Sequence, residues 1–293
     1  MKKSTAVADF TSKLRDYYIL TKPEVNLLIV MATSTGFCLA SPAPLRVAAL
    51  VNTLCGTLLV ASGTATFNQW MEREKDGRMR RTMARPLPAG RLSSREAFLF
   101  GLVLSVGGGV YLAVAVNGLS SLLAISALLS YLMVYTPLKQ KTPWCTLLGA
   151  FPGAMPTLIG WAGARDHIEG QAWFLFAIVF LWQFPHFLAI ALMYRQDYAR
   201  AGFQMLPRDD QHSRFARVEI LAFTIVLVIT ALLPAARVRE PIYLIVTAIA
   251  GALFLYPAVK LAKSATPVMA GRVVRASVLY LPIVLAALIA EKV

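Results

Sequence analysis

The chain has 293 residues, of which 57% are hydrophobic and 15% are charged. A soluble globular domain typically has about 45–50% apolar and about 25% charged residues, so this composition excludes a disordered protein and argues against a soluble enzyme. The formal net charge is +14, which in so apolar a chain indicates basic loops between membrane spans. Cys38, Cys55 and Cys145 lie in apolar runs without CxxC spacing, so neither a disulfide framework nor a zinc site is expected.

Nine apolar stretches are long enough to cross a bilayer, which takes roughly 17–25 residues of helix. In chain order we predict spans over 24–40, 47–67, 97–116, 119–135, 144–163, 172–194, 218–235, 241–259 and 276–290. The N-terminus does not resemble a cleaved signal peptide, because Asp9 and Asp16 interrupt its basic region. The sequence therefore predicts an all-α polytopic membrane protein. We expect a cytoplasmic N-terminal segment over 1–17 and a single nine-helix domain over 18–293.

Lysine and arginine are distributed unevenly between the two sides of this predicted topology. If the N-terminus is cytoplasmic and the spans alternate, 24 of the 29 basic residues fall on the cytoplasmic side. This asymmetry follows the positive-inside rule and supports an N-in, C-out orientation. Two cytoplasmic connections, 68–96 and 195–217, are much longer than the ~4–6 residues typical of compact domains, so they are candidate functional loops.

An acidic cluster opens the first long loop. If the second span continues as a helix, Asn68, Glu72 and Asp76 share one helical face at the membrane surface, where we expect a wet mouth. Mg²⁺ prefers oxygen ligands and completes its coordination with water and substrate phosphates, so this face is a candidate diphosphate site. Arginines that could bind phosphate oxygens follow at Arg78, Arg80, Arg81, Arg85 and Arg91. The alternative is a solvated, charged helix end.

A polar stripe marks the end of the sixth span. Its members share one helical face: Gln183, His186, Ile190, Tyr194 and Asp197. A histidine inside a membrane span faces a cavity or the bundle interior and is a functional candidate. A hydrogen bond between helices is an equally good interpretation. The remaining histidines, His167 and His212, lie in predicted loops and are expected to be solvated.

The fifth span is rich in helix-breaking residues, with Pro152, Pro156 and four glycines between positions 149 and 163. This pattern predicts close helix packing or a broken helix beside a cavity, and close packing is favoured. In the connection before it, Lys139 and Lys141 are either phosphate ligands or topology anchors. There is no P-loop or dinucleotide fingerprint, and the dispersed basic residues argue against nucleic-acid binding.

The acidic cluster and its arginines resemble the first acidic motif of the UbiA superfamily of intramembrane prenyltransferases. The matching residues are Asn68, Glu72, Arg73, Asp76, Arg81-Thr82 and 85–91. Four further segments resemble the heme-farnesylating branch of this superfamily: 20–23, 135–142, 153–161 and 181–207. Two features depart from the superfamily pattern. The second motif, usually rich in aspartate, offers mainly Asp197, and Glu72 stands where aspartate is common.

The resemblance implies a UbiA-type bundle in the cell inner membrane, with a central cavity that opens to the cytoplasmic side. It implies transfer of the farnesyl group of farnesyl diphosphate to a vinyl group of heme b, with addition of water, to give heme O and diphosphate. Heme A synthase or terminal oxidase assembly is the implied destination of the product. A quinone or aromatic prenyltransferase of the same superfamily is the alternative, and a secondary transporter is a more distant one.

The resemblance also implies roles for individual residues. Mg²⁺ would be held by Asn68, Glu72, Asp76 and Asp197. Diphosphate would be bound by Arg73, Arg81, Arg85, Lys139 and Lys141, and heme b by His186, Gln183 and Tyr194. Among these, His186 would act in catalysis together with the four metal ligands, either by ligating the heme iron or by accepting a proton from water.

Overall fold

The computed structural model describes residues 2–206, 213–233, 241–264 and 266–292, and every regular element within these ranges is a helix. Nine helices in the described ranges are long and apolar enough to cross a membrane. They are α2 (Pro23–Ala40), α3 (Val47–Asp76), α4 (Ser94–Ala115), α5 with its continuation to Leu138, α7 (Cys145–Arg165), α8 (Gly170–Met193), α10 (Arg214–Leu232), α11 (Pro241–Lys263) and α12 (Pro267–Lys292). This agrees with the number of spans predicted from the sequence.

Several helix boundaries differ from those predicted. Helix α3 has 30 residues and runs through the acidic cluster to Asp76. Helix α12 begins at Pro267 instead of residue 276, because Arg272 and Arg275 lie on its surface and not in a loop. The second long loop contains a short helix, α9 (Arg195–Ala201). His212 lies outside the described residues.

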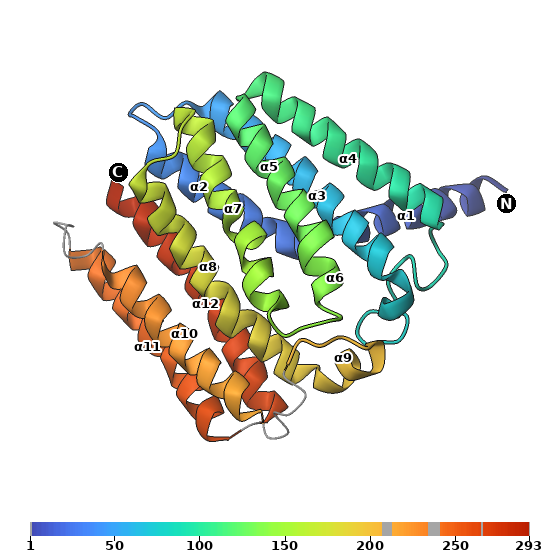
Figure 1. Ribbon diagram of the computed structural model, residues 1–293. Helices are drawn as coiled ribbons and strands as arrows, with labels where there is room; N and C mark the ends of the chain where they lie inside the picture. Colours follow the sequence, from blue (N-terminus) through green and yellow to red (C-terminus); the bar gives the residue numbers. More distant parts are fainter. Residues whose placement is uncertain (1, 207–212, 234–240, 265, 293) are drawn as a thin grey trace.

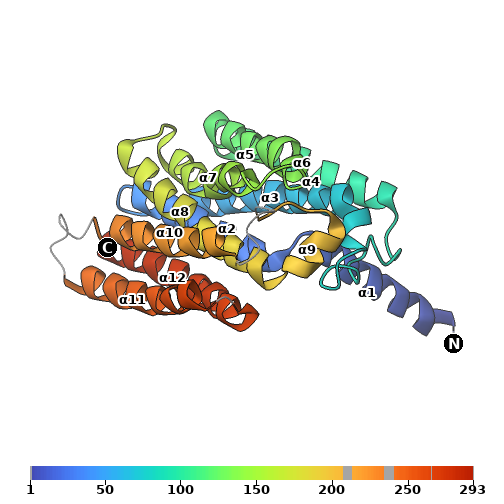
Figure 2. The same ribbon diagram turned by 60° about the horizontal axis from the view of Figure 1, so that its bottom comes forward.

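The spanning helices form a closed ring. Each packs on the next in chain order, from α2 round to α12, and α12 packs back on α2. Helix α1 (Lys2–Leu20) projects from the bundle at the end that carries α9, whereas the C-terminus lies at the opposite end (Figures 1 and 2). The outward faces are apolar, as α4 illustrates with its exposed residues Val103, Val106, Val110 and Val114. A largely apolar outer surface of this kind is suited to lipid.

Two glycines allow α2 and α7 to pack backbone against backbone. A Cβ atom on Gly160 would collide with the carbonyl oxygen of Thr33, and one on Gly36 would collide with that of Thr157. Helix α7 remains continuous through Pro152 and Pro156. The preferred interpretation of the glycine-rich span, close helix packing, is therefore confirmed.

Helix α5 (Gly118–Ser130) ends in a π-helical turn, η1 (Tyr131–Tyr135), before the three-residue helix α6 (Thr136–Leu138). Pro137 cannot donate a backbone hydrogen bond, and the adjacent Thr136 N–H donates five residues back to Tyr131 O. Such π turns are frequent at functional sites. Here the turn brings Tyr131 and Tyr135 to the wall of a cavity.

Candidate active site

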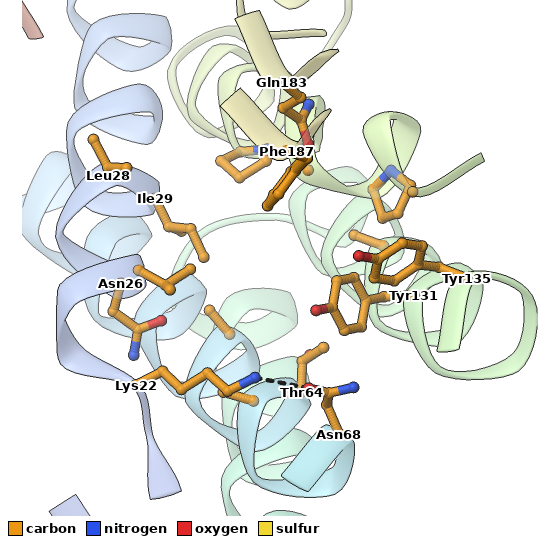
Figure 3. A pocket seen from close by; sticks show the side chains of 18 of the residues that line it. Lys22, Asn26, Leu28, Ile29, Thr64, Asn68, Tyr131, Tyr135, Gln183 and Phe187 are labelled. Atoms are coloured by element: carbon orange, nitrogen blue, oxygen red, sulfur yellow. Dashed lines mark hydrogen bonds between the residues drawn. The ribbon is translucent and has the colours of Figure 1, made fainter. Parts of the chain in front are cut away.

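A cavity of about 390 Å³ lies inside the ring, with charged residues at one end and an apolar interior. Its walls come from α2, α3, α5, η1, α7 and α8, with one residue each of α9 and α12 and further residues from the connections between helices. Lys22 and Asn68 lie across the cavity from Gln183 and Phe187, with Tyr131 and Tyr135 on a third side (Figure 3). The charged end is the end at which α3 and α8 terminate and α9 begins (Figure 1).

The predicted acidic face is present, but it is buried. Asn68, Glu72 and Asp76 all line the cavity, and their exposed fractions are 1%, 5% and 1%. Each carboxylate has a cation partner: Lys139 Nζ donates to Glu72 Oε1 at 2.8 Å, and Arg85 Nη1 donates to Asp76 Oδ2 at 2.7 Å. The expectation of a wet mouth is therefore wrong, because the loop after α3 and the segment after α9 cover this end with Met79, Phe203 and Met205.

Lys22, at the turn between α1 and α2, is a site residue for which no role was predicted from the sequence. Its Nζ donates to Asn68 Oδ1 at 2.7 Å, and its backbone has a left-handed φ of 51°. Residues held in such sparsely populated conformations cluster at functional sites. Burial, followed by repulsion from Arg85, lowers the pKa of Lys22 to about 7. An anion bound beside it would restore its charge.

Lys139 is held in the charged form. Burial opposes its charge, but the ion pair with Glu72 and the side chains of Tyr135 and Tyr131 together outweigh this effect and raise the pKa of Lys139 well above its ordinary value. Its Nζ also lies 4.9 Å from the ring of Tyr135 and 5.4 Å from that of Phe203. The aromatic rings and the ion pair together fix the ammonium at the charged end of the cavity.

The charged residues of the cavity suit an anionic ligand with a bound metal. Four cations, Lys22, Arg81, Arg85 and Lys139, line it against the two carboxylates of Glu72 and Asp76. Within the described residues, no three His, Cys, Asp or Glu side chains come together as a self-sufficient metal site would require. The oxygens of Asn68, Glu72 and Asp76 nevertheless fit Mg²⁺, which binds through one or two carboxylates and takes substrate phosphates as further ligands.

The two deeper polar residues of α8 both line the cavity and both bond to neighbouring helices. Gln183 Nε2 donates to Ala150 O of α7 at 2.8 Å, and His186 Nδ1 lies 2.7 Å from Ser277 Oγ of α12. The interpretation as hydrogen bonds between helices is therefore confirmed. Both side chains also border the cavity, where a ligand could contact them.

The predicted stripe breaks at Tyr194, where α8 ends and α9 begins. Tyr194 and Asp197 do not border the main cavity. Instead, the guanidinium of Arg81 lies 5.0 Å from the ring of Tyr194, and Arg81 N donates to Asp197 Oδ2 at 3.4 Å. Asp197 is also paired with Arg200. The two residues thus contact Arg81, which does border the cavity.

Two of the predicted diphosphate ligands lie away from the cavity. Arg73 Nη1 donates to Trp70 O at 2.7 Å, and its guanidinium lies 5.6 Å from the ring of Trp70. Lys141 is exposed and does not border the cavity. In the loop after α7, His167 bonds to Arg165 O and Glu169 and is exposed, as expected.

Sequence comparison places the chain among prenyltransferases. Residues 29–288 match the model of the UbiA prenyltransferase family. A protein named protoheme IX farnesyltransferase from Solibacter usitatus is 45% identical over 281 residues, which cover 92% of this chain and 96% of that protein. Another protein of that name, from Koribacter versatilis, is 41% identical and covers 96% of this chain and 94% of its own length.

Comparison with solved structures gives the same fold. A structure described as digeranylgeranylglyceryl phosphate synthase superposes with a TM-score of 0.77 at 20% identity, covering 96% of this chain and 98% of its own. A UbiA homolog from Archaeoglobus fulgidus bound to GPP and Mg²⁺ gives a TM-score of 0.66 at 16% identity, over 93% of this chain and 99% of its own. Together with the family match and the nine spans, these similarities show that the chain is a multi-pass membrane protein and belongs to the UbiA prenyltransferase family.

Proposed function

We propose that this prenyltransferase transfers the farnesyl group of farnesyl diphosphate to a vinyl group of heme b, with addition of water, to give heme O. The names of relatives that are 45% and 41% identical over most of the chain support this assignment. The structural observation that best supports the assignment is the distribution of charge in the cavity. Four cations and two carboxylates gather at one end of a largely apolar space, which suits an anionic head group with an apolar tail.

The charged end is proposed to bind and activate the diphosphate. Asn68, Glu72 and Asp76 would hold Mg²⁺, which when bound would stabilise the charge that builds on the departing diphosphate. Lys22, Arg81, Arg85 and Lys139 would bind the phosphate oxygens, since all four border the cavity. Asp197 is kept as a proposed ligand, although its present contacts are Arg81 and Arg200. Arg73 and Lys141 remain proposed phosphate contacts that require a rearrangement to reach the cavity.

The apolar interior is proposed to bind the farnesyl chain and keep water from its first carbon. In the reaction, the bond between this carbon and the diphosphate oxygen breaks, and a carbon–carbon bond forms to the terminal vinyl carbon of heme b. A water oxygen then bonds to the inner vinyl carbon and releases one proton. Gln183, which lies across the cavity from Asn68 (Figure 3), and His186 would contact the heme, with Tyr194 acting through Arg81.

The proposed setting is the cell inner membrane, with the charged end of the bundle facing the cytoplasm. The predicted excess of basic residues on that side supports this orientation. Residues 1–17 would form a cytoplasmic segment, and residues 18–293 one catalytic domain. Heme A synthase or terminal oxidase assembly would receive the product.

Two alternative functions differ from this proposal in the acceptor that is used and in whether diphosphate is released. A quinone or aromatic prenyltransferase would use the same diphosphate site with another acceptor. A transporter would release no diphosphate, and its site would lie near the middle of the membrane, whereas these charges gather at one end.

The experiment is an acceptor competition. Purified protein in detergent is incubated with farnesyl diphosphate and Mg²⁺ in the presence of both heme b and 4-hydroxybenzoate. The products are separated by chromatography and identified by mass spectrometry. We expect farnesylated heme only, with one diphosphate released per heme consumed. Farnesylated hydroxybenzoate with intact heme would refute the assignment in favour of a quinone prenyltransferase.

A further inference from the structure

Two buried residues hold the imidazole of His186, and neither has a role in the reaction as proposed above. Ser277, on α12, has an exposed fraction of 0%, and its Oγ lies 2.7 Å from His186 Nδ1. Trp182 stacks on the imidazole with ring centroids 4.6 Å apart and an angle of 18° between the ring planes. Trp182 Nε1 also donates to Ser277 O at 2.7 Å, so the two residues that hold the ring are bonded to each other.

The direction of the His186–Ser277 bond follows from the position of the serine proton. Ser277 Oγ lies 2.7 Å from the carbonyl oxygen of Val274 as well as from His186 Nδ1. A carbonyl oxygen cannot donate, so the hydroxyl proton must lie between Ser277 and Val274. Ser277 Oγ therefore accepts a hydrogen bond from His186 Nδ1–H. This fixes the tautomer of the neutral imidazole, in which Nε2 carries the lone pair.

His186 Nε2 is the nitrogen left for a ligand. The residue borders the cavity, and its Nε2 has no hydrogen-bond partner among the residues that the structure describes. Histidines that bind metals almost always donate their other ring N–H to a fixed acceptor, which sets the tautomer and the ring orientation. The bond to Ser277 provides such an acceptor.

The depth of His186 is compatible with an acceptor molecule beside the diphosphate site. At about 1.5 Å per residue, His186 lies roughly 10 Å from the end of α8 and Asn68 roughly 12 Å from the end of α3. Both residues border the same cavity, His186 from α8 and Asn68 from α3. A porphyrin whose iron is bound by His186 would therefore share this cavity with the diphosphate.

On the basis of the proposed function, we infer that Ser277 is a positioning residue that presents Nε2 of His186 to the iron of heme b. Trp182, one turn away on the same helix, holds the ring by stacking. Rotation of the imidazole would therefore break its contacts to Trp182 and to Ser277 of α12. The atom of His186 that would bind the iron is therefore Nε2. Through Ser277, α12 would take part in recognising the acceptor.

The test measures heme binding separately from turnover. Purified protein is titrated with ferrous heme b, and absorption and resonance Raman spectra record the affinity and the iron–histidine stretching band. Replacement of residues that orient a metal ligand typically costs about 10–100-fold in affinity. We therefore expect Ser277→Ala to weaken heme binding by about tenfold or more and to weaken or shift that band, with the KM for farnesyl diphosphate unchanged.

The matched control is Ser105→Ala, which removes a buried serine hydroxyl from α4 away from the cavity. Ser105→Ala should leave heme binding unchanged. If the Ser277→Ala protein is unstable, Ser277→Thr and Ser277→Val provide a second pair, because their side chains have nearly the same shape and differ in the hydroxyl. The threonine variant should then bind heme more tightly than the valine variant.

Three results would overturn the inference. The first is a Ser277→Ala protein with unchanged heme affinity and an unchanged iron–histidine band. The second is a wild-type protein that farnesylates heme without showing a histidine-ligated iron, which would leave the proposed function intact. The third is a wild-type protein that neither binds nor consumes heme, which would refute the proposed function as well.

Discussion

The two buried carboxylates of the acidic face are stabilised by specific cation partners. Glu72 is paired with Lys139 and Asp76 with Arg85. Removal of one partner from a buried pair leaves an unpaired charge and costs about 3–5 kcal/mol. Alanine variants at these positions would therefore lower stability as well as activity, and amide variants of the same shape separate the two effects better.

The first prediction concerns the metal site. Asp76→Asn keeps the size of the side chain and an acceptor for Arg85, but it removes the negative charge that suits a divalent cation. We expect turnover to fall by about two orders of magnitude or more, as it does when a group that stabilises the transition state is lost. Glu74→Gln is the control, because this side chain is 80% exposed on the same helix. Equal turnover in both variants would argue against the metal role of Asp76.

The second prediction separates two neighbouring lysines. Lys139 borders the cavity, whereas Lys141 is exposed away from it. Lys139→Gln should raise the KM for farnesyl diphosphate by about tenfold or more, which corresponds to the loss of a charge-assisted contact of about 1.5–3 kcal/mol. Lys141→Gln should have a smaller effect, because Lys141 would reach the diphosphate only after a rearrangement. Steady-state kinetics at varied concentrations of farnesyl diphosphate measures the KM of both variants. A larger effect at Lys141 than at Lys139 would show that the loop rearranges when substrate binds.

The sequence predicted only part of this site. Helical spacing was sufficient to place Asn68, Glu72 and Asp76 on one face, because α3 is continuous through them. The place of Lys22 in the site was not predicted, because it depends on a left-handed backbone conformation directly before a proline. The contacts of Tyr131 depend on a π turn, and the burial of the carboxylates depends on loops that fold over them, so neither follows from local periodicity. The roles of these residues stay predictions.

At the scale of helices, α2 and α7 cross in close contact beside the cavity. Thr33 and Thr157 carbonyls approach the glycines of the opposite helix without room for a side chain. Such contacts between backbones are typical of small residues in membrane helices. Both helices also contribute residues to the cavity wall. A substitution that moves the helices apart at their crossing should therefore displace residues of the site.

The third prediction tests this crossing. Gly160→Ala places a methyl group against Thr33 O, and overpacking of this kind costs typically about 1–3 kcal/mol. Gly107→Ala, on the outward face of α4 with open space at its Cβ position, should be neutral or slightly stabilising. Thermal unfolding of both variants in detergent measures the difference. A Gly160→Ala protein as stable as the wild type would show that the two helices can separate at no cost.

Spans could be predicted well from hydropathy, and their ends could not. The start of α12 was missed because two arginines on a helical surface look like a loop in a hydropathy window. The polar stripe of α8 was extended too far, because Tyr194 leaves the helical conformation with φ −110° and ψ 26°. The hydrophobic periodicity of α8 does not reveal this break, because only one residue separates α8 from α9.

At the scale of the whole molecule, the ring of helices separates an apolar exterior from a cavity that is charged at one end. The fourth prediction is that this end faces the cytoplasm. In a variant without its native cysteines, Glu74→Cys should react with a membrane-impermeant maleimide only after permeabilisation of the cells. His167→Cys, in the loop between α7 and α8, should react in intact cells. The reverse pattern would invert the orientation.

The most direct measurement of the central claim is the mass of the heme product formed by the purified protein in water enriched in ¹⁸O. The proposed reaction adds one farnesyl group and one oxygen from water to each heme b. We therefore expect a product heavier than heme b by both groups, with the added oxygen labelled, and no product when Mg²⁺ is removed by chelation. A farnesylated heme without labelled oxygen, or heme b recovered unchanged by folded protein, would contradict the proposed reaction.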